Sequence, residues 1–338
     1  MRAALAATLL TVFALAPRLE AQGVAGVATL TDCVIGGERV APCRIGYRTF
    51  GRLNTARDNA VLLPTPFLAR AADMQLVVGP AGMVDSATHF VVAVDAFGNG
   101  VSSSPSNTDV ASRGAFERLR IADMVDAQRR FLLETFGITR LHGIVGISMG
   151  GMQAYEWGMR HPAAAGRLAI LVGTPRPGAY DRLLWATIQQ VLDDGRAAGL
   201  PAEAIWLQLG RMETMQGQTP MAVNALVADS LEAMLRAQAV QRATSASLED
   251  YRSQVVALRG HDISAGYGGD LAAAARQLGA PVLLIYSWDD HLVTAGESSR
   301  LASLVGADTL AVPSACGHLV TLCELSRIGG AVRAFLAR

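Results

Sequence analysis

The feature that most limits how this chain can fold is residues 146–150 (GISMG), a Gly-x-Ser-x-Gly motif centred on Ser148. Residues 141–147 before the serine are apolar and partly β-branched, which favours a buried strand. Residues 151–160 after it are good helix formers, and His161-Pro162 ends them. A serine at such a strand-to-helix turn is lifted above the sheet edge, beside free N–H groups of the helix. A glycine-rich turn of an ordinary βα unit is the plainer interpretation, but the flanking strand and helix favour a nucleophile.

Short apolar strands alternate with helices along most of the chain, which predicts a mostly parallel sheet with helices on both faces. The expected strands are residues 27–35, 39–50, 59–64, 89–95, 141–147, 167–172, 281–286 and 309–312. The expected helices are residues 114–136, 149–160, 296–304 and 319–337. The first two strands are predicted to form an antiparallel hairpin at one edge of the sheet.

The alternation stops between residues 175 and 265, where helical stretches such as 181–194 and 219–240 occur without a convincing strand. An all-helical insertion between two strands is suited to cover the carboxyl ends of the strands, where open α/β sheets bind ligands. The alternative is that these helices only thicken one face of the sheet. We predict a core domain of residues 22–174 and 266–338 and a helical cap of residues 175–265, through which any homodimer would form.

The first 21 residues have the pattern of a signal peptide. Arg2 is followed by an apolar stretch, residues 3–16, which is too short to span a bilayer, since that takes about 20 residues. A small residue, Ala21, marks the expected cleavage point. We therefore expect a periplasmic or secreted protein without a stable membrane span. An uncleaved anchor and a wrongly assigned start codon are the alternatives.

The chain has four cysteines, an even number that fits an exported protein. Cys33 and Cys43 lie on either side of a turn signal, Gly36-Gly37-Glu38, so a hairpin would bring them together in a disulfide. Cys316 and Cys323 flank an expected loop and helix start, and their pairing stays open. Neither pair has the spacing of a zinc site, and we expect no metal and no cofactor.

The overall charge balance excludes another class of partner. The chain has a net formal charge of zero over 338 residues and contains no block of basic residues. Proteins that bind nucleic acid present a basic patch or stripe. We therefore expect no nucleic-acid partner.

Two later strand ends carry the residues that a nucleophilic serine needs. The strand over residues 281–286 leads into Asp289 and Asp290, and the strand over 309–312 leads into His318. A serine hydroxyl requires a base, and the base requires a carboxylate that orients it. The chain order serine, acid, histidine is that of α/β-hydrolases. We predict His318 as the base, whereas spacing alone does not separate Asp289 from Asp290.

The other histidines are less suitable as the base. His291 adjoins the acid but lies before the last strand, which is the wrong place for the base in this chain order. His89, His142 and His161 lie at ends of expected strands or helices and are interpreted as structural. His261, within the helical insertion, is expected to face solvent, and a place in the lining of a substrate site is the alternative.

An oxyanion hole requires two backbone N–H groups directed at the developing negative charge. One is expected from Met149, the residue after the nucleophile. The other is expected from the loop after the strand over 59–64, in residues 65–68 (TPFL). Pro66 has no N–H, which leaves Phe67 or Leu68.

The sequence resembles the homoserine O-acetyltransferase family of the α/β-hydrolase fold. The resemblance is carried by residues 47–63 (YRTFGRLNTARDNAVLL), 79–92, 121–128 and the extended serine motif 148–157 (SMGGMQAYEW). It implies Ser148 as the nucleophile and His318 as the base. It also implies Asp290, two residues before Leu292, as the acid, and Phe67 at the position of the family's oxyanion leucine.

Three segments depart from that family's pattern. Residues 65–69 (TPFLA) and 98–107 (GNGVSSSPSN) differ from its usual loops. Residues 188–191 (IQQV) replace a helix segment that carries an arginine for an amino-acid carboxylate, and a homoserine site needs such a cation. We therefore predict an exported ester hydrolase that acts on a small-molecule acyl ester through an acyl-serine intermediate. An O-acyltransferase is the alternative, and a non-catalytic binding protein on this scaffold is the third possibility.

Overall fold

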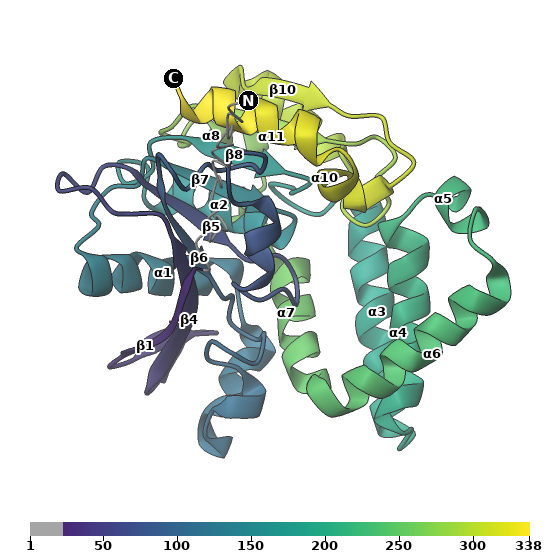
Figure 1. The fold of residues 1–338 in the computed structure, drawn as a ribbon. Coiled ribbons are helices and arrows are strands. Elements are labelled where there is room, and N and C mark those ends of the chain that lie inside the picture. The colour runs from purple at the N-terminus through teal and green to yellow at the C-terminus, as the bar shows by residue number, and fades with distance from the viewer. Residues whose placement is uncertain (1–22) are drawn as a thin grey trace, which may run out of the picture.

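A twisted eight-stranded sheet is the central layer of residues 23–338, the part of the chain that this computed structural model describes (Figure 1). The strands are β1 (Val24–Leu30), β4 (Cys43–Phe50), β5 (Ala60–Pro64), β6 (Phe90–Val94), β7 (Gly143–Ile147), β8 (Leu168–Leu171), β9 (Val282–Tyr286) and β10 (Asp308–Ala311). Their order is β1-β4-β6-β5-β7-β8-β9-β10, and the six strands from β6 to β10 in that order pair in parallel. The predicted mostly parallel sheet is confirmed. The predicted signal peptide lies outside the described residues.

The edge hairpin is present but is interrupted. β1 pairs with β4 antiparallel, and β4 pairs with β6 antiparallel. Between β1 and β4 the chain forms a separate two-stranded sheet, β2 (Cys33–Ile35) and β3 (Glu38–Val40). Gly36 and Gly37 make the turn with positive φ angles, which glycine adopts without strain. A disulfide joins Cys33 to Cys43 next to this small hairpin.

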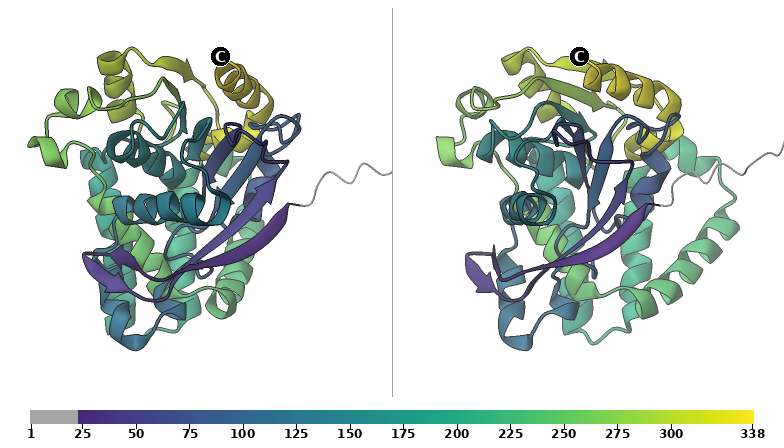
Figure 2. Two further views of the ribbon diagram at one scale, coloured as in Figure 1. Left: turned by 90° about the vertical axis from the view of Figure 1, so that its left-hand side faces the viewer. Right: turned by 60° about the vertical axis from the view of Figure 1, so that its left-hand side comes forward.

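Helices cover both faces of the sheet, as Figures 1 and 2 show. Successive side chains of a strand point to opposite faces, so Leu62 of β5 packs in one apolar core and Leu63 packs in another. The first core includes residues of α1 (Ile121–Phe136), α2 (Met149–Arg160) and α9 (Gly296–Val305). The second includes residues of α11 (Leu325–Leu336) and of the 3-10 turn η1 (Asp73–Val77).

Two predicted helices are shorter than expected. The helix expected from residue 114 begins at Ile121, after the 3-10 segment η3 (Val110–Arg118). Arg120 is extended, and its backbone N–H donates to the Asp123 carboxylate at 3.0 Å, which ends any continuous helix there and starts α1. The last helix is divided into η5 (Gly317–Leu319), α10 (Val320–Cys323) and α11.

An all-helical stretch separates β8 from β9 and lies to one side of the sheet (Figure 1). It contains α3 (Ala179–Ala197), α4 (Ala202–Gly217), α5 (Pro220–Asn224), α6 (Ala228–Ser245) and α7 (Leu248–Gly260), and α8 (Leu271–Ala275) follows. α3 packs against α4 and α7, and α4 packs against α6. The single helix expected over residues 219–240 is two helices, α5 and α6. The division into a core and a cap domain stays a prediction.

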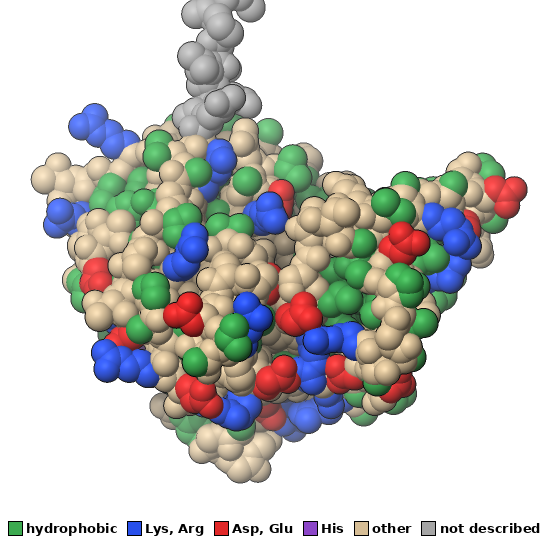
Figure 3. All heavy atoms as spheres, turned by 90° about the horizontal axis from the view of Figure 1, so that it is seen from below, with side chains coloured by type: hydrophobic (Ala, Val, Ile, Leu, Met, Phe, Trp, Pro, Cys, Tyr) green, Lys and Arg blue, Asp and Glu red, His purple; other side chains and the backbone are tan. Residues whose placement is uncertain are grey.

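The outer helix of this insertion exposes apolar side chains. Met234 and Val240 of α6 and Met221 of α5 are between 46% and 68% exposed. Figure 3 shows the insertion on its right, where hydrophobic side chains gather around a hollow between the outer helix and the body. A homodimer formed through the insertion would bury this surface, and that contact stays a prediction. None of the helices described for residues 23–338 has the length and apolar composition to cross a bilayer.

Candidate active site

Ser148 occupies a strained turn between β7 and α2. Its φ of 55° and ψ of −120° lie in a region that L-residues rarely adopt. The Ser148 N–H donates to the Leu171 carbonyl at 2.8 Å, which ties the turn to β8. A Cβ at Gly146 would overlap the Gly150 carbonyl, and one at Gly150 would overlap the Pro64 carbonyl. The two glycines are therefore needed for the chain to turn this sharply.

A continuous hydrogen-bonded chain joins Ser148, His318 and Asp290. His318 Nε2 lies 2.9 Å from Ser148 Oγ, and His318 Nδ1 lies 2.7 Å from Asp290 Oδ2. All three side chains are buried, with 7%, 8% and 2% of their surface exposed. The loops that carry them follow β7, β9 and β10 at the carboxyl ends of these parallel strands. This geometry allows His318 to take a proton from Ser148 while the carboxylate stabilises the imidazolium.

The structure separates the two adjacent aspartates by environment. Asp290 is buried, and its Oδ1 accepts the N–H groups of Leu292 and Val293, each at 2.9 Å. Asp289 is exposed and lies near the Ser314 N–H at 3.4 Å. Of the two aspartates, Asp290 is the one that forms a hydrogen bond with His318. Spacing left Asp289 and Asp290 as alternatives, and the structure places Asp290 beside the histidine.

The turn that carries His318 is closed by a disulfide between Cys316 and Cys323. Between these cysteines lie His318, Leu319 and Leu322. A second contact comes from the insertion, where Thr219 Oγ1 donates to the Ala315 carbonyl at 2.6 Å. The histidine turn is thus constrained by a covalent bond on one side and by the helical insertion on the other.

The backbone N–H groups of Met149 and Phe67, two of the candidate oxyanion donors, have no acceptor among residues 23–338. Leu68, the other candidate in this loop, is different, because its N–H donates to Gln254 Oε1 at 2.8 Å. Of the two N–H groups that the sequence left open, the one at Phe67 is therefore free for an oxyanion. Gln254 lies in α7, and the sequence carried no local signal for its contact with this loop.

An apolar pocket of about 280 Å³ opens onto Ser148 and His318. Its walls come from the 65–69 loop, from η1, from α3 of the insertion and from the histidine turn. The lining side chains include Phe67, Met74, Leu76, Trp185, Leu292 and Leu322. Asp73 is the only ionisable residue among them besides His318, and no arginine lines the pocket. Trp185 and Leu322 were not anticipated, because their contact with the serine depends on how the insertion and the last loop fold back.

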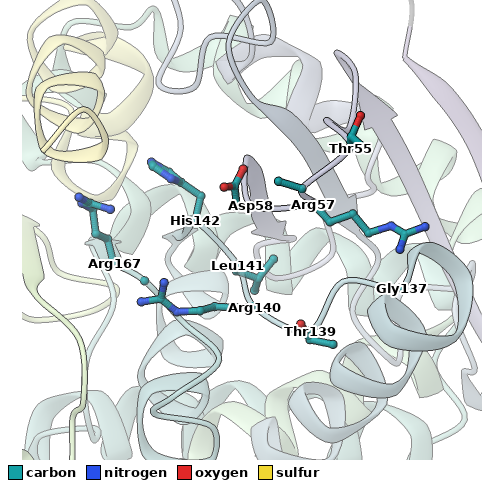
Figure 4. A pocket seen from close by; sticks show the side chains of 11 residues that line it. Thr55, Arg57, Asp58, Gly137, Thr139, Arg140, Leu141, His142 and Arg167 are labelled. Carbon is teal, nitrogen blue, oxygen red and sulfur yellow. The ribbon is translucent and has the colours of Figure 1, made fainter.

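A second pocket, of about 340 Å³, lies at the other ends of β5, β7 and β8 (Figure 4). Its lining is polar and includes Arg57, Arg140 and Arg167. None of Ser148, Asp290 and His318 lines it. The apolar pocket above the serine is therefore the one associated with the hydrogen-bonded chain.

The remaining histidines that the structure places in the fold make local contacts. His142 Nε2 lies 2.8 Å from the Leu336 carbonyl, and His161 Nε2 lies 3.4 Å from Asp126. His261 is buried, with 3% exposed, and its Nε2 lies 3.1 Å from the Thr174 carbonyl. The expectation that His261 faces solvent is wrong, because α7 turns back onto the loop that follows β8.

The family model of the alpha/beta hydrolase fold matches residues 80–322, which is most of the chain. The chain belongs to the alpha/beta hydrolase fold family. The predicted fold class is thereby confirmed.

Several relatives have known names. Residues of this chain are 36% identical over 160 positions to a probable esterase of Corynebacterium glutamicum, covering 46% of each chain. They are 33% identical over 193 positions to an ethyl acetate hydrolase of Pseudomonas veronii, covering 54% of this chain and 55% of that one. A homoserine O-acetyltransferase of Citrifermentans bemidjiense is 33% identical over 161 positions, covering 42% and 44%. The resemblance to that family is confirmed, and the chain spans about half the length of the relatives it matches.

Solved structures resemble the whole fold. An acetylester hydrolase from Corynebacterium glutamicum superposes with a TM-score of 0.83, covering 94% of this chain and 97% of that chain. The sequence identity over this superposition is 24%, so the likeness concerns the fold alone.

Proposed function

We propose that this protein is a serine-nucleophile ester hydrolase of the alpha/beta hydrolase fold. The observation that carries the proposal is the Ser148–His318–Asp290 hydrogen-bonded chain at the base of an apolar pocket. In the first step Ser148 Oγ attacks the ester carbonyl and His318 Nε2 takes its proton. The N–H groups of Phe67 and Met149 stabilise the oxyanion.

The same residues complete the cycle. As the tetrahedral intermediate collapses, the carbon–oxygen bond to the alcohol breaks and His318 returns the proton to the leaving alkoxide. The acyl group is now an ester of Ser148. Water then attacks this ester with His318 as the base, and the acid is released with the free serine. Asp290 holds the imidazole through its contact with His318 Nδ1.

The pocket supports a small, neutral ester as the substrate. Its volume of about 280 Å³ is at the lower end of ligand pockets, and its walls are apolar. An anionic acyl or alcohol group would lose its hydration there without a cationic partner. The names of two relatives, a probable esterase and an ethyl acetate hydrolase, agree with this class.

An O-acyltransferase is the second candidate, favoured by the homoserine O-acetyltransferase relatives. It would use the same acyl-serine and differ only in the acceptor. The absence of an arginine from the described pocket lining weighs against homoserine, whose carboxylate requires a cation. A non-catalytic binding protein is the third candidate, and it is disfavoured because all three residues of the chain keep catalytic geometry.

The test measures hydrolysis of short esters, p-nitrophenyl acetate and ethyl acetate, by the wild type and by Ser148→Ala. We expect steady hydrolysis by the wild type and at least a thousandfold lower kcat for the variant. Activity that survives in a folded Ser148→Ala protein would overturn the nucleophile assignment. Product analysis with added alcohols separates the two enzyme classes, since a transferase would form a new ester faster than the free acid.

We also propose that the protein is exported. The support is the signal-peptide pattern of residues 1–21 together with two disulfides, Cys33–Cys43 and Cys316–Cys323, in the described structure. Such bonds persist in oxidising compartments and are rare in the cytosol. Fractionation of producing cells and sequencing of the mature N-terminus test this. A cytosolic protein that begins at Met1 would contradict it.

A further inference from the structure

One fully buried side chain of the helical insertion connects the two loops that follow β5 and β6. Gln254 of α7 has no exposed surface. Its Oε1 accepts the Leu68 N–H at 2.8 Å, and its Nε2 donates to the Phe97 carbonyl at 2.9 Å. Because both of its polar atoms are used, the side chain has one satisfied orientation and holds the two loops at a set distance.

The same turn of α7 makes further contacts with these loops. The Tyr251 ring lies 4.9 Å from the Phe67 ring in an edge-to-face arrangement. The Asp250 carboxylate accepts the Ser106 N–H at 2.9 Å and the Ser106 hydroxyl at 2.5 Å. α7 is therefore attached to both loops at Asp250 and Tyr251 as well as at Gln254.

The loop that carries Phe67 requires such support. Leu68 has a φ of 59°, a left-handed conformation that costs a leucine about 1–3 kcal/mol. Gln153 of α2 holds the start of the loop, since its Nε2 donates to the Thr65 carbonyl at 3.1 Å. The bond from Leu68 to Gln254 holds the other end, directly after Phe67, which lines the pocket above Ser148.

We propose that Gln254 is a positioning residue for the oxyanion hole. By fixing Leu68 in its left-handed conformation, Gln254 directs the Phe67 N–H towards the carbonyl oxygen that Ser148 attacks. Helix α7 of the insertion then contributes to catalysis as well as to the shape of the pocket. This inference rests on the proposed function, because it concerns the hydrolysis of an ester at Ser148.

Two substitutions separate this role from a purely structural one. Gln254→Met keeps the length of the side chain but removes both hydrogen bonds. Gln254→Glu keeps the acceptor for Leu68 and replaces the amide donor to Phe97 by a carboxyl group, which donates there only when it is protonated. We expect Gln254→Met to lower kcat about ten- to a hundredfold with KM within about twofold of the wild type, as for a displaced oxyanion donor. Gln254→Glu should keep most of the wild-type kcat.

Each rate is expressed per active site, counted by complete reaction of Ser148 with a fluorophosphonate. Asp123→Ala is the matched control. Like Gln254, Asp123 is buried and accepts backbone N–H groups, those of Gly36 and Arg120, but it lies at the start of α1 and does not line the pocket above the serine. It should lower stability and leave kcat per active site unchanged. Wild-type kcat in folded Gln254→Met, or equal losses in both Gln254 variants, would overturn the proposal.

Amide hydrogen exchange provides a readout that does not depend on activity. The Leu68 amide should exchange slowly in the wild type and in Gln254→Glu and much faster in Gln254→Met, with the Ser148 amide unchanged. If Gln254→Met does not fold, the test depends on Gln254→Glu alone. A kcat near that of the wild type in this variant supports the proposal. A hundredfold loss of kcat while the Leu68 amide stays protected contradicts it. If the wild type shows no hydrolysis that depends on Ser148, the proposed function is wrong. The comparison of amide exchange would still show whether Gln254 holds Leu68 in place.

Discussion

The nucleophile and the base of the candidate site are held by different kinds of structure. Ser148 lies between two inner elements, β7 and α2, and its position follows from the backbone, through the bond to Leu171 and the close packing of Gly146 and Gly150. His318 follows β10, the last strand of the sheet, whose residues are mostly exposed. Its position follows from a side-chain contact with Asp290 and from the disulfide around its turn. Substitutions on the nucleophile side, around Ser148, and on the base side, around His318, should therefore affect activity and stability in different ways.

Among substitutions that leave Ser148 in place, the largest effect is expected on the base side, at the carboxylate. Asp290→Asn should lower kcat about 10⁴-fold, because a neutral amide neither favours the required tautomer of His318 nor stabilises the imidazolium. The fold should be kept, since the asparagine oxygen can still accept the Leu292 N–H. Steady-state kinetics with p-nitrophenyl acetate measure kcat, and a far-ultraviolet circular dichroism spectrum shows whether the fold is kept.

Asp289→Asn is the matched control for this change. The neighbouring carboxylate is exposed and does not touch His318, so its loss should change kcat by less than about twofold. Equal effects at the two positions would show that the observed contact of Asp290 is not the one that acts in catalysis.

On the nucleophile side, the sensitive positions carry no catalytic group. Gly150→Ala would place a methyl group against the Pro64 carbonyl and push the start of α2 away from β5. A displacement of about 1 Å at Ser148 and Met149 costs on the order of a hundredfold in kcat, and we expect a clear fall in Tm as well. Gly296→Ala, where a Cβ meets nothing within 4 Å, is the control and should be neutral. An unchanged rate in Gly150→Ala would mean that the elbow is more pliable than its packing indicates.

The two disulfides provide a third comparison, because they enclose loops of similar length. The sequence separations are 10 and 7 residues, so the chain-entropy model assigns each about 2.5–3 kcal/mol of stability. Replacing Cys316 and Cys323 by serine should lower kcat about tenfold, because the His318 turn is freed. Replacing Cys33 and Cys43 should lower stability and leave kcat within about twofold.

Urea denaturation and kinetics of the two double variants check this contrast. Equal rates in both would show that Asp290 alone orients the histidine. A large loss of activity in the Cys33 and Cys43 variant would contradict the purely structural role of that bond.

The parts of the site that could be predicted from the sequence are those whose causes are local. The elbow at Ser148 was predictable because strand, turn and helix are contiguous, and His318 followed from chain order. Spacing alone did not separate Asp289 from Asp290, since only burial and the contact with His318 distinguish adjacent carboxylates, and the choice of Asp290 came from the family resemblance. The loop pattern alone did not separate Phe67 from Leu68 either, because the decisive partner, Gln254, is 186 residues away from Leu68, and only the resemblance pointed to Phe67. Contacts of that range depend on how the insertion folds back.

The smallest expected effect is a change of stability with pH, and it comes from the Asp181 carboxylate, which supports the base side. The Asp181 carboxylate accepts the Thr294 N–H at 3.0 Å, in the loop that follows Asp290. Burial raises the pKa of Asp181 above its ordinary value of 3.8, and the negative charge of Asp290 adds to this. Since the folded pKa is raised, the stability that Asp181 contributes is fully present below pH 3.8 and is lost as the pH rises through the folded pKa.

Asp181→Asn does not titrate in this range, so the wild type should lose stability relative to this variant as the pH rises above 3.8. Urea denaturation of both proteins at half-unit steps of pH measures the difference. If the free energies of unfolding of the two proteins change in parallel with pH, the pKa of Asp181 is the same in the folded and unfolded states, and the prediction is wrong. The nucleophile side offers no equivalent, since Ser148 is held by backbone groups that do not titrate. A loss of stability with rising pH that is absent from Asp181→Asn would therefore place this pH dependence on the base side.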